Sequence, residues 1–188
     1  AGSEYTGLPI FTCAGIRTTM AHATWNRNRL EPNQAVLFEI PGCINRYHAA
    51  FFRPVYLGEP TAQILESAEL LISNLQLAKS HIRPGLKAGD VYDVVRANVD
   101  SAGSGFSMNR RAAYSIGIGF APDWGEGHIF SMWDGEQGRL QEGMTFHLTT
   151  GSLLIDGVGR FYCTDTILIT EYGCETLTDG LERKLYVR

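Results

Sequence analysis

The chain has 188 residues, enough for one domain with a sizeable buried core. Hydrophobic residues make up 44% and charged residues 19% of it, a composition typical of folded globular proteins and not of disordered chains. The net charge of −4 provides no basic field for nucleic acid, and no run approaches the roughly 20 apolar residues that span a bilayer. We therefore expect neither a nucleic-acid nor a membrane partner.

The first part of the chain alternates short β-prone runs with polar loops. A strand is expected over residues 8–14, followed by a polar loop over residues 15–33. The apolar run 35–40 stops at Pro41-Gly42, a strong turn signal, and a second run covers residues 47–57. Two such runs joined by a short turn favour an antiparallel hairpin.

The middle of the chain carries the clearest helical pattern. Apolar residues recur there at three- and four-residue spacing and form one face, made of Ile64, Leu65, Ala68, Leu71, Ile72, Leu75 and Ala78. Pro60 and Thr61 suit the start of this helix, and Arg83-Pro84-Gly85 ends it. A second helix is predicted over residues 90–102, with valines on one side.

The last third is rich in glycine, aromatics and short apolar runs. Strands are expected over residues 115–120, 145–149, 152–155, 160–170 and 175–177. No linker or repeat divides the chain, so residues 1–188 are interpreted as a single domain. Strands, two helices and more strands indicate the α+β class, with helices covering a curved antiparallel sheet whose concave face suits a small ligand.

Several polar side chains interrupt these apolar segments. Glu39, His48, Arg53 and His147 fall within expected strands, and His22 falls in the loop before them. Buried charges and imidazoles are costly without a partner. Taken singly, each histidine fits an ordinary structural hydrogen bond, and Glu39 fits an ion pair with Arg53. Taken together, the five indicate a polar cavity lined from several sides.

The segment 120–127 is the second unusual feature. Proline and two glycines fix a loop that carries Asp123, Trp124 and Glu126. An indole ring can stack on a cationic ligand, and carboxylates would balance its charge. The alternative is an ordinary turn whose tryptophan packs on the core.

The hairpin residues point to a known family. Residues 36–42, Arg46-Tyr-His-Ala-Ala50, Arg53 and Gly58 resemble the hairpin that carries two aspartate ligands in the pita-bread metallopeptidases, which include methionine aminopeptidases and Xaa-Pro peptidases. In this resemblance the five metal-ligand positions of the family correspond to Glu39, Ala50, Ile116, Thr149 and Thr164. Four of these side chains cannot hold a divalent cation as the family does, so neither a metal nor another cofactor is expected.

Among pita-bread proteins, the creatinases and the ectoine hydrolases work without a metal. This chain is most similar to the ectoine hydrolases, through Arg46-Tyr-His-Ala-Ala50, the block 114–126, and segments 143–147 and 183–187. The match runs from about residue 11 to the end and implies a pita-bread catalytic domain that is N-terminally incomplete.

The resemblance implies a metal-independent hydrolase that opens a C–N bond in a small zwitterionic amidine. His22 matches the loop histidine that creatinases use for proton transfer and is expected to be the general acid/base. Glu39 or Glu126 would act as base, nucleophile or amidinium partner. The substrate carboxylate is assigned to Arg53 or His48. The expected substrate-binding residues are Tyr47, His48, Arg53, Trp124 and His147.

Two other interpretations remain open. One is a pita-bread domain without activity that serves as an interaction module. The other is an Xaa-Pro peptidase-like protein with relocated ligands at Glu39, His48 and His147, although no HxxxH or HExxH spacing supports it. The four separated cysteines predict a reduced, cytoplasmic protein, and the family resemblance implies a homodimer.

Overall fold

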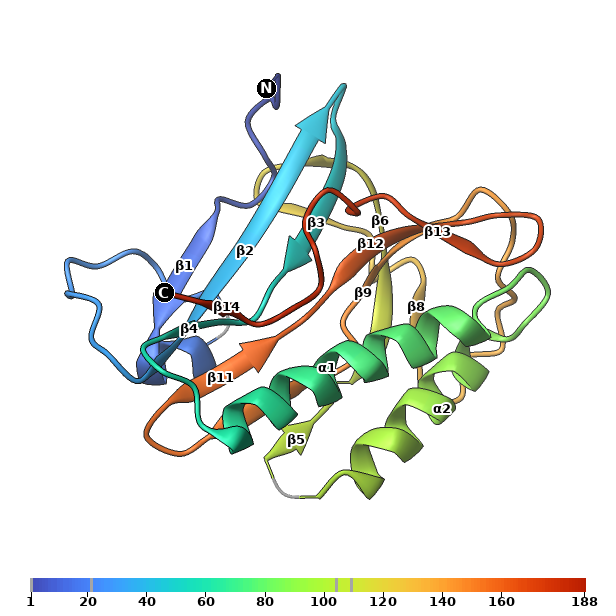
Figure 1. Ribbon diagram of the computed structural model, residues 1–188. Helices are drawn as coiled ribbons and strands as arrows, with labels where there is room; N and C mark the ends of the chain where they lie inside the picture. The colour runs from blue at the N-terminus through green and yellow to red at the C-terminus, as the bar shows by residue number, and fades with distance from the viewer. Residues whose placement is uncertain (1, 21, 104, 109) are drawn as a thin grey trace.

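A mostly antiparallel sheet and two helices that run side by side along one face of it dominate the molecule (Figure 1). The computed structural model describes residues 2–20, 22–103, 105–108 and 110–188. The predicted α+β class, with a curled antiparallel sheet and two covering helices, is confirmed.

The elements follow one another as strands, a helix pair and more strands. The helices are α1 (Ala62–His81) and α2 (Ala88–Ser101), and a short 3₁₀ helix, η1, spans Gly15–Thr19. The strands are β1 (Phe11–Ala14), β2 (Gln34–Ile44), β3 (Tyr47–Phe52), β4 (Val55–Leu57), β5 (Phe106–Ser107), β6 (Arg111–Phe120), β7 (Asp123–Gly125), β8 (Ser131–Trp133), β9 (Thr145–Leu148), β10 (Ser152–Ile155), β11 (Gly159–Tyr162), β12 (Asp165–Ile169), β13 (Cys174–Thr176) and β14 (Tyr186–Val187).

The strands form two sheets. The larger has the order β13-β12-β9-β6-β3-β2-β4-β14, with β1 paired to β2 and both β7 and β8 paired to β6. The smaller has the order β11-β10-β5. After β6 the chain passes from the larger sheet to the smaller one between β9 and β10, and it returns between β11 and β12. These crossings, at residues 149–151 and 163–164, form a seam between the sheets.

The helix pair covers the main core. Most of the predicted face of α1 is buried, including Leu71 and Leu75, whereas Leu65 at its edge is 45% exposed. Val91, Val95 and Val99 of α2 pack into the same cluster. Within the described residues, neither helix is long and apolar enough to cross a membrane.

One buried polar residue ties the helices to the seam. Asn74 of α1 is fully buried, and its side-chain amide donates to the carbonyl oxygen of Thr150. The amide of Asn98, on α2, donates to Oδ1 of Asn74 at 2.8 Å. Because a buried amide without partners is costly, these bonds fix the helix pair relative to the turn at residues 149–151.

The hairpin turn lies later than expected. Strand β2 does not stop at Pro41-Gly42 but pairs with β3 up to Ile44, and the reversal occurs at Asn45 and Arg46, which have φ of 51° and 67°. The proline is tolerated because Ala50, its partner across the pair, donates its amide to Thr166 and not to β2. At such a non-hydrogen-bonded position a missing N–H costs no ladder bond.

Two long expected strands are divided. The run 47–57 breaks at Arg53-Pro54 into β3 and β4, and the run 160–170 breaks at the seam into β11 and β12. The prediction of a strand at 115–120 missed its first half, since β6 begins at Arg111. The short strands β5, β7, β8 and β14 were not predicted, because two or three residues are too few for a periodic pattern.

Candidate functional site

A cavity of about 290 Å³ opens beside the seam. Its walls combine aromatic and aliphatic side chains with a few polar groups, namely Phe11, His22, Leu37, Glu39, Phe52, Arg111, Tyr114, His147, Thr149, Gly151, Ser152, Tyr162 and Thr164. This volume is at the small end of the range of about 300–1,000 Å³ typical of ligand pockets. The cavity therefore suits a small molecule.

His22 and Glu39 form a pair in the cavity wall. Nε2 of His22 lies 3.4 Å from Oε2 of Glu39, whose side chain is only 4% exposed, whereas that of His22 is 50% exposed. His22 has a φ of 55° and stacks on the ring of Phe11. The hydrogen bond to Glu39 raises the pKa of His22 above its ordinary value, despite the opposing effect of burial. The pair can therefore hold and transfer a proton near neutral pH.

His147 lies across the cavity in a hydrogen-bonded chain. Its Nδ1 is 2.8 Å from the hydroxyl of Tyr114, and its Nε2 is 2.7 Å from Oγ1 of Thr164. Burial lowers the pKa of His147 to about 3, so the ring is neutral at neutral pH. A neutral imidazole has one donor and one acceptor nitrogen, so it donates to one of these hydroxyls and accepts from the other.

In this series of hydrogen bonds, the proton of one of the two hydroxyls is not donated to His147. Tyr114 also accepts from Nε1 of Trp124 at 3.1 Å, and Thr164 accepts from the amide of Phe52 at 2.9 Å. If Nε2 of His147 carries the proton, the Thr164 hydroxyl has a spare donor; in the other tautomer the spare donor belongs to Tyr114. Tyr114 and Thr164 both line the cavity, so one hydroxyl or the other can donate a hydrogen bond to a ligand, depending on the tautomer of His147.

His22, Glu39 and His147 are the expected site residues that the structure brings together in this cavity. Tyr47 and Glu126 line a different hollow, of about 360 Å³, together with residues of β6 and β9. Glu126 is thus separated from the His22–Glu39 pair.

The remaining expected residues do not line the cavity. His48 is buried, with its Nε2 accepting from the amide of Gly7 at 2.9 Å and its Nδ1 3.0 Å from the carbonyl oxygen of Arg46. Trp124 is 1% exposed and packs against Ala50 and Ile116, although its indole holds Tyr114. These contacts give both residues a structural role.

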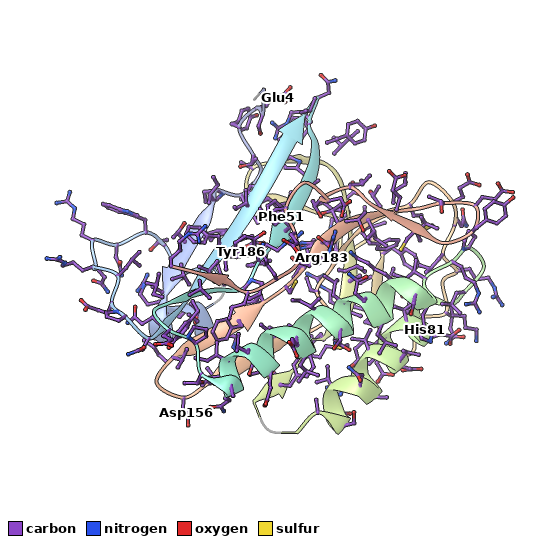
Figure 2. The ribbon with its side chains drawn as sticks, in the orientation of Figure 1. Glu4, Phe51, His81, Asp156, Arg183 and Tyr186 are labelled. Atoms are coloured by element: carbon purple, nitrogen blue, oxygen red, sulfur yellow. The ribbon has the colours of Figure 1, made fainter. Side chains whose placement is uncertain are left out.

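The guanidinium of Arg53 forms an ion pair with a buried carboxylate. It does not pair with Glu39, since its Nη2 lies 2.9 Å from Oδ1 of Asp165, which is fully buried. Lys79 and Arg183 bind the other oxygen of Asp165. Figure 2 shows Arg183 near the middle of the molecule, between β2 and α1. The four side chains form an ion-pair cluster that ties α1 and the C-terminal segment to the sheet.

Tyr114 and Arg111 also line the cavity and were not predicted from the sequence. Both lie on the half of β6 that was not recognised as a strand, and a tyrosine or arginine at a strand end is not unusual. No period-two signal marked this half, because the β6–β8 pairing shifts register between Arg111 and Ala113 and burial does not alternate there.

The positions that the family resemblance assigns to metal ligands lie in or beside the cavity. Glu39, Thr149 and Thr164 line it, and Ala50 and Ile116 pack beside it. Within the described part of the chain, no three His, Cys, Asp or Glu side chains lie close enough together to hold a metal ion. Both nitrogens of His147 are also engaged by hydroxyls. This donor set does not fit the metal pair of a pita-bread peptidase.

Comparisons with known proteins agree with this fold. The model of the family "Metallopeptidase family M24" matches residues 1–171. The ectoine hydrolase of Halomonas elongata is 34% identical over 188 residues, covering 100% of this chain and 46% of that protein. An Xaa-Pro dipeptidase of Pyrococcus furiosus is 26% identical over 184 residues, covering 98% of this chain and 51% of that protein.

Solved structures show the same architecture. The X-Pro aminopeptidase of Thermotoga maritima superposes with a TM-score of 0.85 at 19% identity, over 100% of this chain and 51% of that chain. The prolidase of Pyrococcus furiosus gives a TM-score of 0.82 at 21% identity, over 96% and 52%. The fold is therefore the pita-bread fold, and the chain spans about half the length of the relatives it matches.

Proposed function

The chain belongs to metallopeptidase family M24, and on this premise we propose that it is a metal-independent hydrolase that cleaves a C–N bond in a small zwitterionic amidine. The similarity to ectoine hydrolase supports this choice over a peptide substrate. A cavity of about 290 Å³ also favours a small ring over a peptide chain.

The His22–Glu39 pair carries the proposal. It is an acid/base pair in the wall of a cavity where the side chains that correspond to metal ligands are mostly hydroxyls and hydrocarbons. Without a metal to activate water, a hydrolase needs a protein group to take its proton, and such general bases typically contribute about 10²–10⁴-fold in rate.

The residues suggest a division of labour. The buried carboxylate of Glu39 balances the positive charge of the amidinium, and the neutral imidazole of His22 takes a proton from the water whose oxygen bonds to the amidinium carbon. Protonated His22 then returns this proton to the leaving nitrogen, which is the general acid step. His147 stays neutral and lets Tyr114 or Thr164 donate to a polar atom of the ring.

We also propose a cellular location and an oligomeric state for the enzyme. All four cysteines, residues 13, 43, 163 and 174, are free thiols, which supports a reduced cytoplasmic protein. A homodimer is proposed from the family resemblance, and light scattering of the purified protein tests it.

The main alternative is an Xaa-Pro peptidase. The similarity to the Pyrococcus furiosus dipeptidase favours it, and the donor set of the cavity opposes it. A non-catalytic interaction module is opposed by the His22–Glu39 pair, since a module would have no need of it.

The test is turnover of ectoine, followed by proton NMR with and without EDTA. We expect hydrolysis that EDTA does not inhibit. The His22→Ala variant should lower kcat by about 10²–10⁴-fold, and Glu39→Gln should act similarly. His128→Ala and Glu142→Gln, which alter the same residue types at exposed positions, are the matched controls. Loss of activity in EDTA, restored by Mn²⁺ or Zn²⁺, would favour the peptidase, to be confirmed with Xaa-Pro dipeptides.

A further inference from the structure

Arg111 is the cationic side chain among the residues that line the cavity, apart from the histidines. It opens β6, three positions before Tyr114. Its guanidinium carbon lies 4.4 Å from the centroid of the Tyr114 ring, a cation–π contact that holds the group against one wall. The side chain is half-buried, so it is reachable from the cavity.

Toward the residues that the structure describes, most of the hydrogen-bonding capacity of Arg111 is unused. A guanidinium has five N–H donors. Nη1 of Arg111 makes one long bond, of 3.4 Å, to Oγ of Ser131. Among the described residues no carboxylate pairs with Arg111, in contrast to Arg53 and Arg183, which share Asp165.

A glycine keeps space for this group. A Cβ added at Gly127 would collide with Nη1 of Arg111, and it would lie 3.1 Å from Cβ of Tyr114. Any other residue at position 127 would therefore push the guanidinium away from its place on Tyr114.

The cavity thus has two charged walls. Glu39 stands on β2 and Arg111 on β6, and the sheet order places β3 between these strands. Phe52 of β3 lines the cavity and stacks on Tyr162, with ring centroids 5.3 Å apart. A ligand that is positive at one end and negative at the other would match this distribution of charge.

We propose that Arg111 binds the anionic group of the ligand, a carboxylate, through its planar fork of free N–H donors. This role was assigned to Arg53 or His48 from the sequence, and neither has donors that face the cavity. This inference rests on the proposed function only for the identity of the ligand, whose reacting end would lie against Glu39.

The experiment uses two probes and a matched pair of variants. Arg111→Gln removes the cation, and Arg110→Gln makes the same change at the exposed neighbouring position. Arg111→Lys keeps the charge without the fork, and Gly127→Ala displaces the guanidinium without altering charge. Circular dichroism establishes which variants fold, and the last two carry the test if Arg111→Gln does not.

The first probe is acetate, which does not react. We expect acetate to shift the backbone amide signals of Tyr114 and Ser115 in ¹⁵N NMR spectra of the wild type and of Arg110→Gln, and not in spectra of Arg111→Gln. Equal shifts in all three proteins, or none in the wild type, would overturn the inference.

The second probe is ectoine, compared with the same ring lacking its carboxylate, 2-methyl-1,4,5,6-tetrahydropyrimidine. Arg111→Gln should lower kcat/KM for ectoine by roughly 10- to 100-fold, mainly through KM, which is the usual effect of a lost charge-assisted contact. The carboxylate-free ring should be turned over equally by both proteins.

The two proposals fail in different ways. Ectoine hydrolysed with the same kcat/KM by the wild type and Arg111→Gln would sink the role of Arg111 and leave the proposed function. Acetate binding that depends on Arg111, with no hydrolysis of ectoine, would keep the anion site and reject the proposed substrate.

Discussion

The imidazole of His22 lies flat against the ring of Phe11, with centroids 4.4 Å apart and planes 8° from parallel. Phe11 is also the partner of Glu39 in the pairing of β1 with β2. The same strand pair therefore supplies the carboxylate and the surface on which the imidazole rests.

The first prediction concerns the charge of His22. Its pKa is raised chiefly by the hydrogen bond to Glu39, so the folded state binds the proton more tightly than the unfolded chain. The resulting stabilisation is present at low pH and is lost as the pH rises through the raised pKa. In Glu39→Gln the pKa of His22 should fall, as measured from the imidazole Cε1 proton by NMR. As a control, Glu142→Gln, which alters an exposed carboxylate, should leave the pKa of His22 as in the wild type.

The second prediction concerns the burial of His147. Because burial lowers its pKa from 6.5 to about 3, the unfolded state takes up a proton below pH 6.5 while the folded state does not. Stability should therefore decrease as the pH falls through this window. In urea titrations the wild type should lose about 1.4 kcal/mol per pH unit more than His147→Gln. The same slope in both proteins would show that His147 also takes up a proton in the folded state.

The third prediction concerns the buried carboxylate of Asp165. Burial alone would raise its pKa, but hydrogen bonds from Arg183 and Lys79 outweigh this effect and lower it. In Asp165→Asn three cationic groups lose their counter-charge, which should cost about 3–5 kcal/mol of unfolding free energy in urea. Asp156→Asn, in an exposed turn at the periphery of the molecule (Figure 2), should cost less than about 0.5 kcal/mol.

The fourth prediction concerns the bond between α1 and the seam. Asn74→Ala leaves the Thr150 carbonyl and the Asn98 amide without their partner, and should cost about 1–3 kcal/mol. Ser73→Ala, one position earlier and exposed, should be nearly neutral. If the bond also holds the cavity wall, Asn74→Ala should raise KM for ectoine at temperatures where it remains folded. An unchanged KM would confine the role of Asn74 to stability.

The sequence was most informative where periodicity is long. The face of α1 was predicted because its pattern repeats over about four turns, and Glu39 stood out because a carboxylate interrupts an apolar strand. The prediction that the strand ends at Pro41-Gly42 was wrong. Whether a proline ends a strand depends on whether its position would donate a hydrogen bond to the neighbouring strand, and the partner strand determines this.

The site was harder to predict than the fold. Arg53 and Arg111 look alike in sequence, and what separates them is the position of Asp165, which lies 112 residues from Arg53. Likewise, Trp124 does not line the cavity and contributes to it only through the hydrogen bond that its Nε1 donates to the Tyr114 hydroxyl. Whether an arginine is available to a ligand depends on whether a carboxylate of the protein already pairs with it. That carboxylate can lie far away in the sequence, so the sequence pattern around the arginine does not reveal it.

The cavity lies where the chain passes from one sheet to the other. Thr149, Gly151 and Thr164, which line it, belong to neither sheet, and the walls beyond them belong one to each. A small rotation of one sheet against the other would widen or narrow the opening while leaving every hydrogen bond within a sheet intact. The size of the opening thus depends on the angle between the two sheets as well as on the side chains that line it.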